Sequence, residues 1–180
     1  MEKGVIKSKA RKTIVITGAE CSGKTTLSKT LADHYNTTFK EEYAREYLQN
    51  LNKAYTFEDV EDLAQKQEVR QSRFINSQPE LAILDTDLLT IRIWMADKFM
   101  QFPGWITENL SNHFANRIYI VCKPDIPYED DIFREDPERR DEIHKKYIKL
   151  LKVKAADRFT EVGGTVEDRL KSATEFIKQF

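Results

Sequence analysis

The feature that most constrains the fold of this chain is a short glycine-containing motif near its N-terminus. The stretch VITGAECSGKTTL occupies residues 15–27 and contains one fixed spacing, in which four residues separate Gly18 from Gly23, Lys24 and Thr25. A loop of this kind between a strand and a helix N-terminus directs backbone N–H groups and the helix dipole at an anion. The spacing therefore predicts a phosphate-binding loop, on condition that a strand precedes it and a helix follows it.

The pattern of apolar residues supplies both conditions. Residues 13–17, TIVIT, are β-branched and mostly apolar and predict a buried strand, while apolar residues at helical spacing predict a helix over residues 24–35. Lys24 is placed to reach the β- and γ-phosphates of a nucleotide, and the hydroxyl of Thr25 is placed to bind Mg²⁺. We therefore expect ATP and Mg²⁺ as cofactors, with the nucleotide bound by Gly18, Ala19, Glu20, Cys21, Ser22, Gly23, Lys24, Thr25 and Thr26.

Strands and helices are predicted to alternate along the rest of the chain. Apolar runs predict strands from Leu81 and from Arg117, and the short alternation RFTEVGG predicts a weaker strand over residues 158–164. Capping signals predict helices from Thr56 to about Ser77, after Asp136 and Pro137, and after Thr165 with Asp168. This order indicates an α/β fold, a three-layer α/β/α sandwich around a mostly parallel sheet, with ligands at the carboxyl ends of the strands.

Composition places the chain among globular proteins without a strong overall charge. Its 180 residues include 29 Lys and Arg against 30 Asp and Glu, which gives a formal net charge of −1. This balance provides no global attraction to nucleic acid or to an anionic membrane, so we expect neither as a partner. We expect a basic, flexible segment over residues 1–12 and one domain over residues 13–180. The oligomeric state stays open.

Several absences in the sequence bear on the compartment. The N-terminal segment has no apolar stretch typical of a signal peptide, and no later run approaches the ~18 apolar residues that span a bilayer. The two cysteines, Cys21 and Cys122, have no zinc-binding neighbours at the usual spacing. We therefore expect a soluble protein in a reducing, cytoplasmic compartment.

Two aspartates follow the strand predicted from residue 81. Asp85 ends an apolar run, and from this position a carboxylate can hold Mg²⁺ through water. Asp87 lies two residues further on and is placed to accept a hydrogen bond from a substrate hydroxyl. The alternative for either residue is capping of the helix that follows, and capping is compatible with both roles. We expect a metal site at Thr25 and Asp85, and we expect Asp87 to bind or activate the acceptor.

The stretch FKEEYAREYL, residues 39–48, combines acids, tyrosines and an arginine after a short predicted strand. A phosphoryl acceptor needs groups that orient its hydroxyls and a base that takes a proton, and we expect Glu42, Tyr43 and Arg45 to bind it. Glu42 and Arg45 lie three residues apart, so a helical salt bridge between them is the simpler alternative on chemistry alone.

The stretch DIFREDPERRDEIHKKY, residues 131–147, is rich in charge and overlaps a segment of about residues 128–142 that resembles a lid. A mobile lid would bring Arg134, Arg139 and Arg140 onto the transferring phosphates. The alternative is a solvated face, in which the neighbouring acids pair with these arginines.

Taken together, GAECSGKTTL, NTTFKEEYAREYL, LAILDTDLLT and PDIPYEDDIFREDPERRDEIHKKY resemble the ribosylnicotinamide kinase domain of the NadR-type NAD-salvage proteins. The resemblance runs from about Thr13 to the C-terminus. Many NTPases share the phosphate loop, whereas the Glu-Tyr-x-Arg-Glu and Asp-Thr-Asp blocks in this order are more specific. The resemblance implies a P-loop kinase fold and transfer of the γ-phosphate of ATP to the ribose 5′-hydroxyl of nicotinamide riboside, which gives nicotinamide mononucleotide.

The resemblance also implies roles for individual residues. The residues that match the phosphate loop are Gly18, Gly23, Lys24 and Thr25. Those that match the acceptor block are Glu42, Tyr43, Arg45 and Glu46, and those that match the metal and substrate aspartates are Asp85 and Asp87. The expected catalytic set is Lys24, Glu42, Asp87, Arg134, Arg139 and Arg140. Only twelve residues precede the first strand, so we expect no adenylyltransferase region, no helix-turn-helix repressor domain and no synthesis of NAD by this chain alone.

Aromatic residues are the remaining candidates for the acceptor site. Nicotinamide riboside carries a positive pyridinium ring, which aromatic faces and carboxylates favour. The candidates are Tyr43, Tyr55, Trp94 and Trp105. We expect Tyr55 and Trp105 to bind substrate and Trp94 to lie in the core, because its neighbours are apolar. Two alternatives stay open: a kinase for another nucleoside or small metabolite, and a nucleotide-binding regulatory module that hydrolyses ATP slowly.

Overall fold

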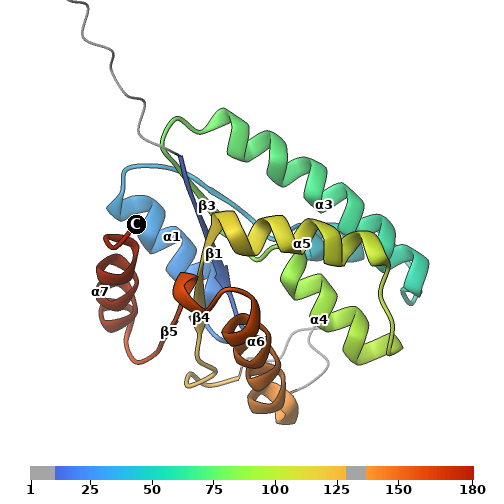
Figure 1. The fold of residues 1–180 in the computed structure, drawn as a ribbon. Helices are drawn as coiled ribbons and strands as arrows, with labels where there is room; N and C mark the ends of the chain where they lie inside the picture. Colours follow the sequence, from blue (N-terminus) through green and yellow to red (C-terminus); the bar gives the residue numbers. More distant parts are fainter. Residues whose placement is uncertain (1–10, 129–136) are drawn as a thin grey trace, which may run out of the picture.

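The computed structural model describes residues 11–128 and 137–180, in which strands and helices alternate as expected (Figure 1). The strands are β1 (Lys12–Thr17), β2 (Phe39–Lys40), β3 (Leu81–Asp85), β4 (Arg117–Cys122) and β5 (Phe159–Val162). The α-helices are α1 (Lys24–His34), α2 (Tyr43–Gln49), α3 (Phe57–Ser77), α4 (Leu88–Phe99), α5 (Gly104–Asn116), α6 (Arg140–Lys154) and α7 (Val166–Ile177). Two short 3₁₀ helices, η1 (Pro137–Arg139) and η2 (Ala156–Arg158), flank α6.

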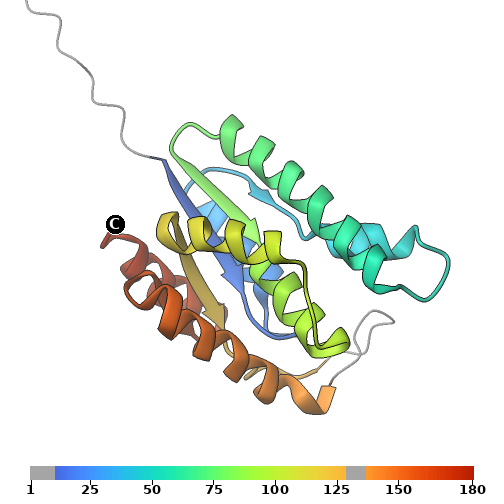
Figure 2. The ribbon, with the colours of Figure 1, turned by 45° about the vertical axis from the view of Figure 1, so that its right-hand side comes forward.

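In the described part of the chain the strands form one five-stranded sheet in the order β2-β3-β1-β4-β5. Every pair of neighbouring strands is parallel, so the expected mostly parallel sheet is wholly parallel here. Figure 2 shows β1, β3 and β4 side by side and pointing toward the same end of the molecule. The loops that follow β1, β2, β3 and β4 therefore meet at one edge of the sheet, where parallel sheets bind ligands.

Two hydrophobic clusters lie on opposite faces of this sheet. Because side chains alternate along a strand, Ile14 of β1 and Ile83 of β3 pack with α1 and α7. Their neighbours Val15 and Leu84 pack on the other face with α3, α4, α5 and α6. Figure 1 shows the same division, with α1 and α7 on one side of the sheet and α3, α4, α5 and α6 opposite. The expected three-layer α/β/α sandwich is thus confirmed.

The capping signals in the sequence fix the starts of two helices. The side chain of Thr56 accepts from the backbone N–H of Asp59, whose carboxylate accepts from the N–H of Thr56, and this capping box opens α3. Thr165 and Asp168 form the same arrangement at α7. At α6 the expectation needs a correction, because Pro137 opens a 3₁₀ turn and the α-helix begins only at Arg140. Asp136 lies outside the described residues.

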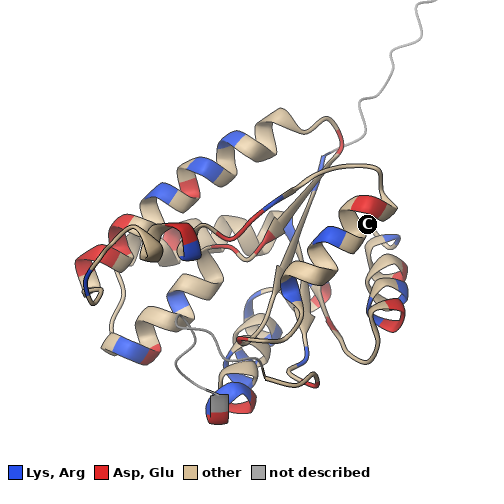
Figure 3. Ribbon diagram, turned by 180° about the vertical axis from the view of Figure 1, so that it is seen from behind, with Lys and Arg blue, Asp and Glu red and all other residues tan. Residues whose placement is uncertain are grey.

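The surface carries both signs of charge in close alternation. Figure 3 shows Lys and Arg interspersed with Asp and Glu along the helices in that view. None of the helices within the described ranges has the length and apolar character needed to cross a bilayer.

Candidate functional site

The loop between β1 and α1 has the backbone that its glycines predict. Gly18 has a φ of 140°, and a Cβ at this position would lie 2.6 Å from the backbone oxygen of Cys122, so glycine is required there. Gly23 has a φ of 80° and is the N-cap of α1, where its missing side chain leaves the first backbone N–H groups of the helix without a side-chain cap. These N–H groups and the helix dipole form an anion site at the sheet edge.

Two side chains of the loop bond to the loop itself. The Nζ of Lys24 donates to the carbonyl oxygen of Ala19 over 2.9 Å, and the Oγ of Ser22 donates to the same oxygen over 2.8 Å. Both bonds cross the turn and hold its curvature. They place the Lys24 ammonium against the loop, at the wall of the cavity described below.

The hydroxyl of Thr25 meets the carboxylate of Asp85 at the start of α1. The Oγ1 of Thr25 donates to Oδ2 of Asp85 over 2.6 Å, and Oδ1 of this buried aspartate has no hydrogen-bond partner among the described residues. Burial, followed by the nearby charge of Glu42, raises the pKa of Asp85 to about 6. A buried carboxylate with one unsatisfied oxygen beside a hydroxyl matches the oxygen ligands that Mg²⁺ prefers. The residues present therefore fit a magnesium ion.

One cavity of about 690 Å³ lies over this loop and contains most of the expected site. All nine expected nucleotide-binding residues, 18–26, line it. The cavity is also lined by Glu42, Arg45 and Tyr55, and by residues that sequence analysis did not single out, among them Lys53, Thr90, Asp97 and Tyr147. The structure thus brings the phosphate loop and part of the expected acceptor block into one space large enough for small ligands.

Glu42 reaches the cavity because of the strand register. Lys40 of β2 pairs with Leu84 of β3, and continuing this register by two residues places Glu42 beside Thr86. The Oγ1 of Thr86 donates to Oε1 of Glu42 over 3.4 Å. Glu42 is also the N-cap position of α2, yet its side chain makes no capping bond. Its half-buried carboxylate therefore lies at the cavity wall.

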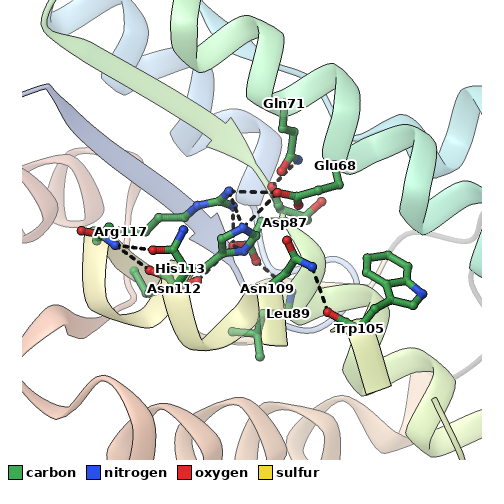
Figure 4. A network of polar contacts seen from close by, with 12 residues as sticks. Glu68, Gln71, Asp87, Leu89, Trp105, Asn109, Asn112, His113 and Arg117 are labelled. Atoms are coloured by element: carbon green, nitrogen blue, oxygen red, sulfur yellow. Dashed lines mark hydrogen bonds and ion pairs between the residues drawn. The ribbon is translucent and has the colours of Figure 1, made fainter. Parts of the chain in front are cut away.

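Asp87 lies elsewhere in this geometry, and its expected contact with the acceptor stays a prediction. Its carboxylate is wholly buried, accepts from Arg117 Nη1 over 2.9 Å and from the Tyr119 hydroxyl over 3.0 Å, and caps α4 through the N–H of Leu89 (Figure 4). His113 also faces it, with Nδ1 3.7 Å from the carboxylate. The residues described at the cavity wall do not include Asp87. Its charge neutralises a buried guanidinium instead.

The aromatic candidates separate into two groups. Tyr55 and Trp94 line the cavity with their rings edge to face and 5.0 Å apart, and Trp94 Nε1 donates to the Tyr55 hydroxyl over 3.3 Å. The expected core role of Trp94 therefore holds only for part of its ring. The described cavity wall includes neither Trp105, whose Nε1 donates to Glu61 over 3.1 Å, nor Tyr43.

Tyr43 lines a second, smaller cavity of about 350 Å³. Its ring lies 4.1 Å from the guanidinium of Arg70, which is also paired with Glu46. Glu42 and Arg45 line both cavities. The acceptor block is therefore divided, with Glu42 and Arg45 on the main cavity and Tyr43 and Glu46 turned away from its described wall.

The arginines of the lid-like segment also have different surroundings. Arg134 lies outside the described residues. Arg139 pairs with Asp97 through both terminal nitrogens, at 2.8 and 2.9 Å, and with Glu142. Arg140 donates to the carbonyl oxygens of Cys21, Pro124 and Ile126 over 3.2, 2.6 and 2.9 Å. Arg140 therefore contacts the phosphate loop through the carbonyl oxygen of Cys21.

Arg169 is a functional candidate that sequence analysis missed. Only 3% of it is exposed, its Nη1 donates to the carbonyl oxygen of Ser22 over 2.7 Å, and it forms an ion pair with Asp125. It shares a face of α7 with Ala173 and Ile177, both buried, at a spacing of four residues. In the sequence, Arg169 occupies the same helix face as the apolar Ala173 and Ile177. This pattern could have indicated that the Arg169 side chain makes a buried polar contact.

Comparisons with solved structures give the same fold. A NadR protein in complex with NR (nicotinamide riboside) matches with a TM-score of 0.73 and 27% identity, over 94% of this chain and 51% of that one. A NadR protein in complex with NAD and AMP-PNP matches with a TM-score of 0.70 and 24% identity, over 94% and 49%. Deoxyadenosine kinase from M. mycoides has a TM-score of 0.62 and 15% identity, over 93% and 100%.

These neighbours place the fold among P-loop kinases. The chain spans about half the length of the two NadR chains that it matches. No curated protein sequence gives a significant match. The family model described as AAA domain matches residues 13–169, from the first strand into the last helix. The chain therefore belongs to this AAA-domain family of P-loop proteins.

Proposed function

We propose that the protein transfers the γ-phosphate of ATP to the ribose 5′-hydroxyl of nicotinamide riboside and releases nicotinamide mononucleotide and ADP. The observation that carries this proposal is a single cavity that joins the whole phosphate loop to Glu42 and to the Tyr55–Trp94 pair. The 27% identity with a NadR protein in complex with nicotinamide riboside supports the choice of acceptor.

The donor end of the cavity holds the triphosphate. Backbone N–H groups of residues 18–26 and the start of α1 surround the phosphates, and the Lys24 ammonium leaves the Ala19 carbonyl to contact the transferring group. Thr25 and Asp85 are the residues that would hold Mg²⁺. The ion would neutralise negative charge on the phosphates.

The acceptor end holds the riboside. The edge-to-face rings of Tyr55 and Trp94 offer π-electron density to the positive pyridinium ring, and this attraction strengthens where water is excluded. Glu42, which lines the same cavity as the loop and the rings, takes the proton of the 5′-hydroxyl while the oxygen of that hydroxyl bonds to the γ-phosphorus. The bond between the γ-phosphorus and the β,γ-bridging oxygen breaks, and its electron pair leaves with ADP.

A screen of phosphate acceptors tests the proposal. The purified protein is mixed with Mg-ATP and, in separate reactions, with nicotinamide riboside, other nucleosides, nucleoside monophosphates or no acceptor. We expect ADP and nicotinamide mononucleotide in equal amounts by coupled assay and mass spectrometry. Faster phosphorylation of another nucleoside would retain the kinase but overturn its acceptor, and ADP release that ignores every acceptor would favour a regulatory ATPase.

A further inference from the structure

The residue between the two aspartates after β3 has a backbone conformation that β-branched residues rarely adopt. Thr86 has a φ of 63°, in the left-handed region, and only 1% of it is exposed. Strain of this kind persists where the surrounding structure enforces it, and it gathers at functional sites. The question is which contacts this conformation makes possible.

The left-handed turn sends three successive side chains to three different partners. In an extended strand Asp85 and Asp87 would point to the same face. Here Asp85 meets Thr25 at the metal site, whereas Asp87 meets Arg117 in the interior. Thr86, between them, directs its hydroxyl to Glu42 at the cavity. The turn therefore links the donor site, the interior and the acceptor site.

Thr86 is held firmly by its own backbone. Its N–H donates to the carbonyl oxygen of Ile16 over 2.9 Å, and its carbonyl oxygen accepts from Nε2 of Gln71 over 3.1 Å. Gln71 lies on α3 and is 1% exposed. With both backbone groups bonded to buried partners, the position of the Thr86 hydroxyl is set by the core of the protein.

Glu42 is less constrained than the residue that it contacts. It is half-buried, and as the N-cap of α2 it makes no side-chain capping bond. The Thr86 hydroxyl donates to its Oε1 over 3.4 Å, a length that leaves room for tightening when substrate binds. We propose that Thr86 is a positioning residue that holds the Glu42 carboxylate against the acceptor hydroxyl. This inference rests on the proposed function, because Glu42 is the proposed base.

Two variants of Thr86 distinguish the contribution of its hydroxyl from the contribution of its β-branched shape. Thr86→Val keeps the β-branch and removes the donor, so we expect kcat/KM for nicotinamide riboside to fall roughly 10-fold or more, with the KM for ATP within about twofold of wild type. Thr86→Ser keeps the hydroxyl and should recover most of the activity. Thr174→Val is the matched control, since Thr174 is a buried threonine on α7 whose hydroxyl bonds to the Lys171 carbonyl; it should be as active as wild type.

A double-mutant cycle tests whether Thr86 acts through Glu42. In a Glu42→Gln background, Thr86→Val should lower kcat much less than it does in wild type. If Thr86→Val does not fold, as judged by circular dichroism, Thr86→Ala replaces it in the same cycle. Wild-type kinetics in the Thr86 variant, additive losses in the cycle, or equal losses with valine and serine would overturn the inference. A wild-type protein that phosphorylates no riboside would overturn the proposed function itself.

Discussion

The hydroxyl of Thr25 and the carboxylate of Asp85 are 60 residues apart in the chain and 2.6 Å apart in the structure. Their contact joins the start of α1 to the end of β3 and leaves Oδ1 of Asp85 without a partner among the described residues. The pKa of this aspartate is raised by burial to about 6, from an ordinary value of 3.8. The Asp85 carboxylate is therefore a candidate ligand for a cation. When no cation is bound, burial of its negative charge lowers the stability of the folded protein.

The effect of Asp85 on stability depends on pH, and the direction of this dependence can be tested. A carboxyl whose pKa is raised by folding favours the folded state while protonated, so its contribution is lost as pH rises from about 4 to about 6. Asp85→Asn removes the charge, and we expect it to stabilise the Mg²⁺-free protein near neutral pH by on the order of 1 kcal/mol. The same variant should lose Mg²⁺-dependent kinase activity. Thermal melts from pH 4 to 7 with wild type alongside check the first part, and an Asp85→Asn protein that melts lower at neutral pH would contradict it.

Because Asp87 pairs with the buried Arg117, we expect the corresponding substitution at Asp87 to lower stability, in contrast to Asp85→Asn. Asp87→Asn keeps the cap on α4 but leaves the buried guanidinium of Arg117 with the more distant carboxylate of Glu68, 3.7 Å away, as its counter-charge, so we expect a loss of about 3 kcal/mol in the free energy of unfolding. Urea melts measure this, with Asp157→Asn, an exposed acid of η2, as the control. If Asp87→Asn is as stable as wild type and only its KM for the riboside is raised, this would support a contact between Asp87 and the acceptor.

The two tryptophans form a matched pair for the acceptor site. Each is half-buried and donates through Nε1 to a neighbour, Trp94 to Tyr55 and Trp105 to Glu61, but the cavity wall as described includes only Trp94. Trp94→Leu should raise the KM for nicotinamide riboside by about tenfold, since a desolvated cation–π contact contributes about 1–2 kcal/mol. Trp105→Leu should leave that KM within about twofold. Steady-state kinetics at saturating ATP compare them, and equal effects of the two changes would remove Trp94 from the proposed acceptor site.

Arg139 and Arg140 are adjacent, but we expect substitutions at the two positions to have different effects on ATP binding. Arg140→Met removes hydrogen bonds to Cys21, Pro124 and Ile126 and should loosen the phosphate loop, so we expect the KM for ATP to rise about tenfold. Arg139→Met breaks ion pairs at a side chain that is 41% exposed and should leave ATP binding almost unchanged. Calorimetric titration with a non-hydrolysable ATP analogue distinguishes the two, and the reverse order of effects would show that Arg139 contacts the nucleotide.

The sequence by itself determined the features that depend on near neighbours. The phosphate loop needs only a strand, two glycines and a helix start in succession, and Gly18 and Gly23 adopt the left-handed conformations that such a turn requires. The capping boxes at Thr56 and Thr165 involve residues three apart, so they also follow from local order. The parallel sheet followed from the alternation of strands and helices, because parallel strands need crossover connections.

Only the tertiary structure decided which residue of each similar pair reaches the cavity. Glu42 and Asp87 are both acids that follow strands at the same sheet edge, but the left-handed turn at Thr86 and the need of buried Arg117 for a counter-charge direct Asp87 inward. Trp94 and Trp105 are likewise separated by the packing of α4 and α5. These outcomes depend on contacts across 30 or more residues, which the order of neighbours along the chain does not encode.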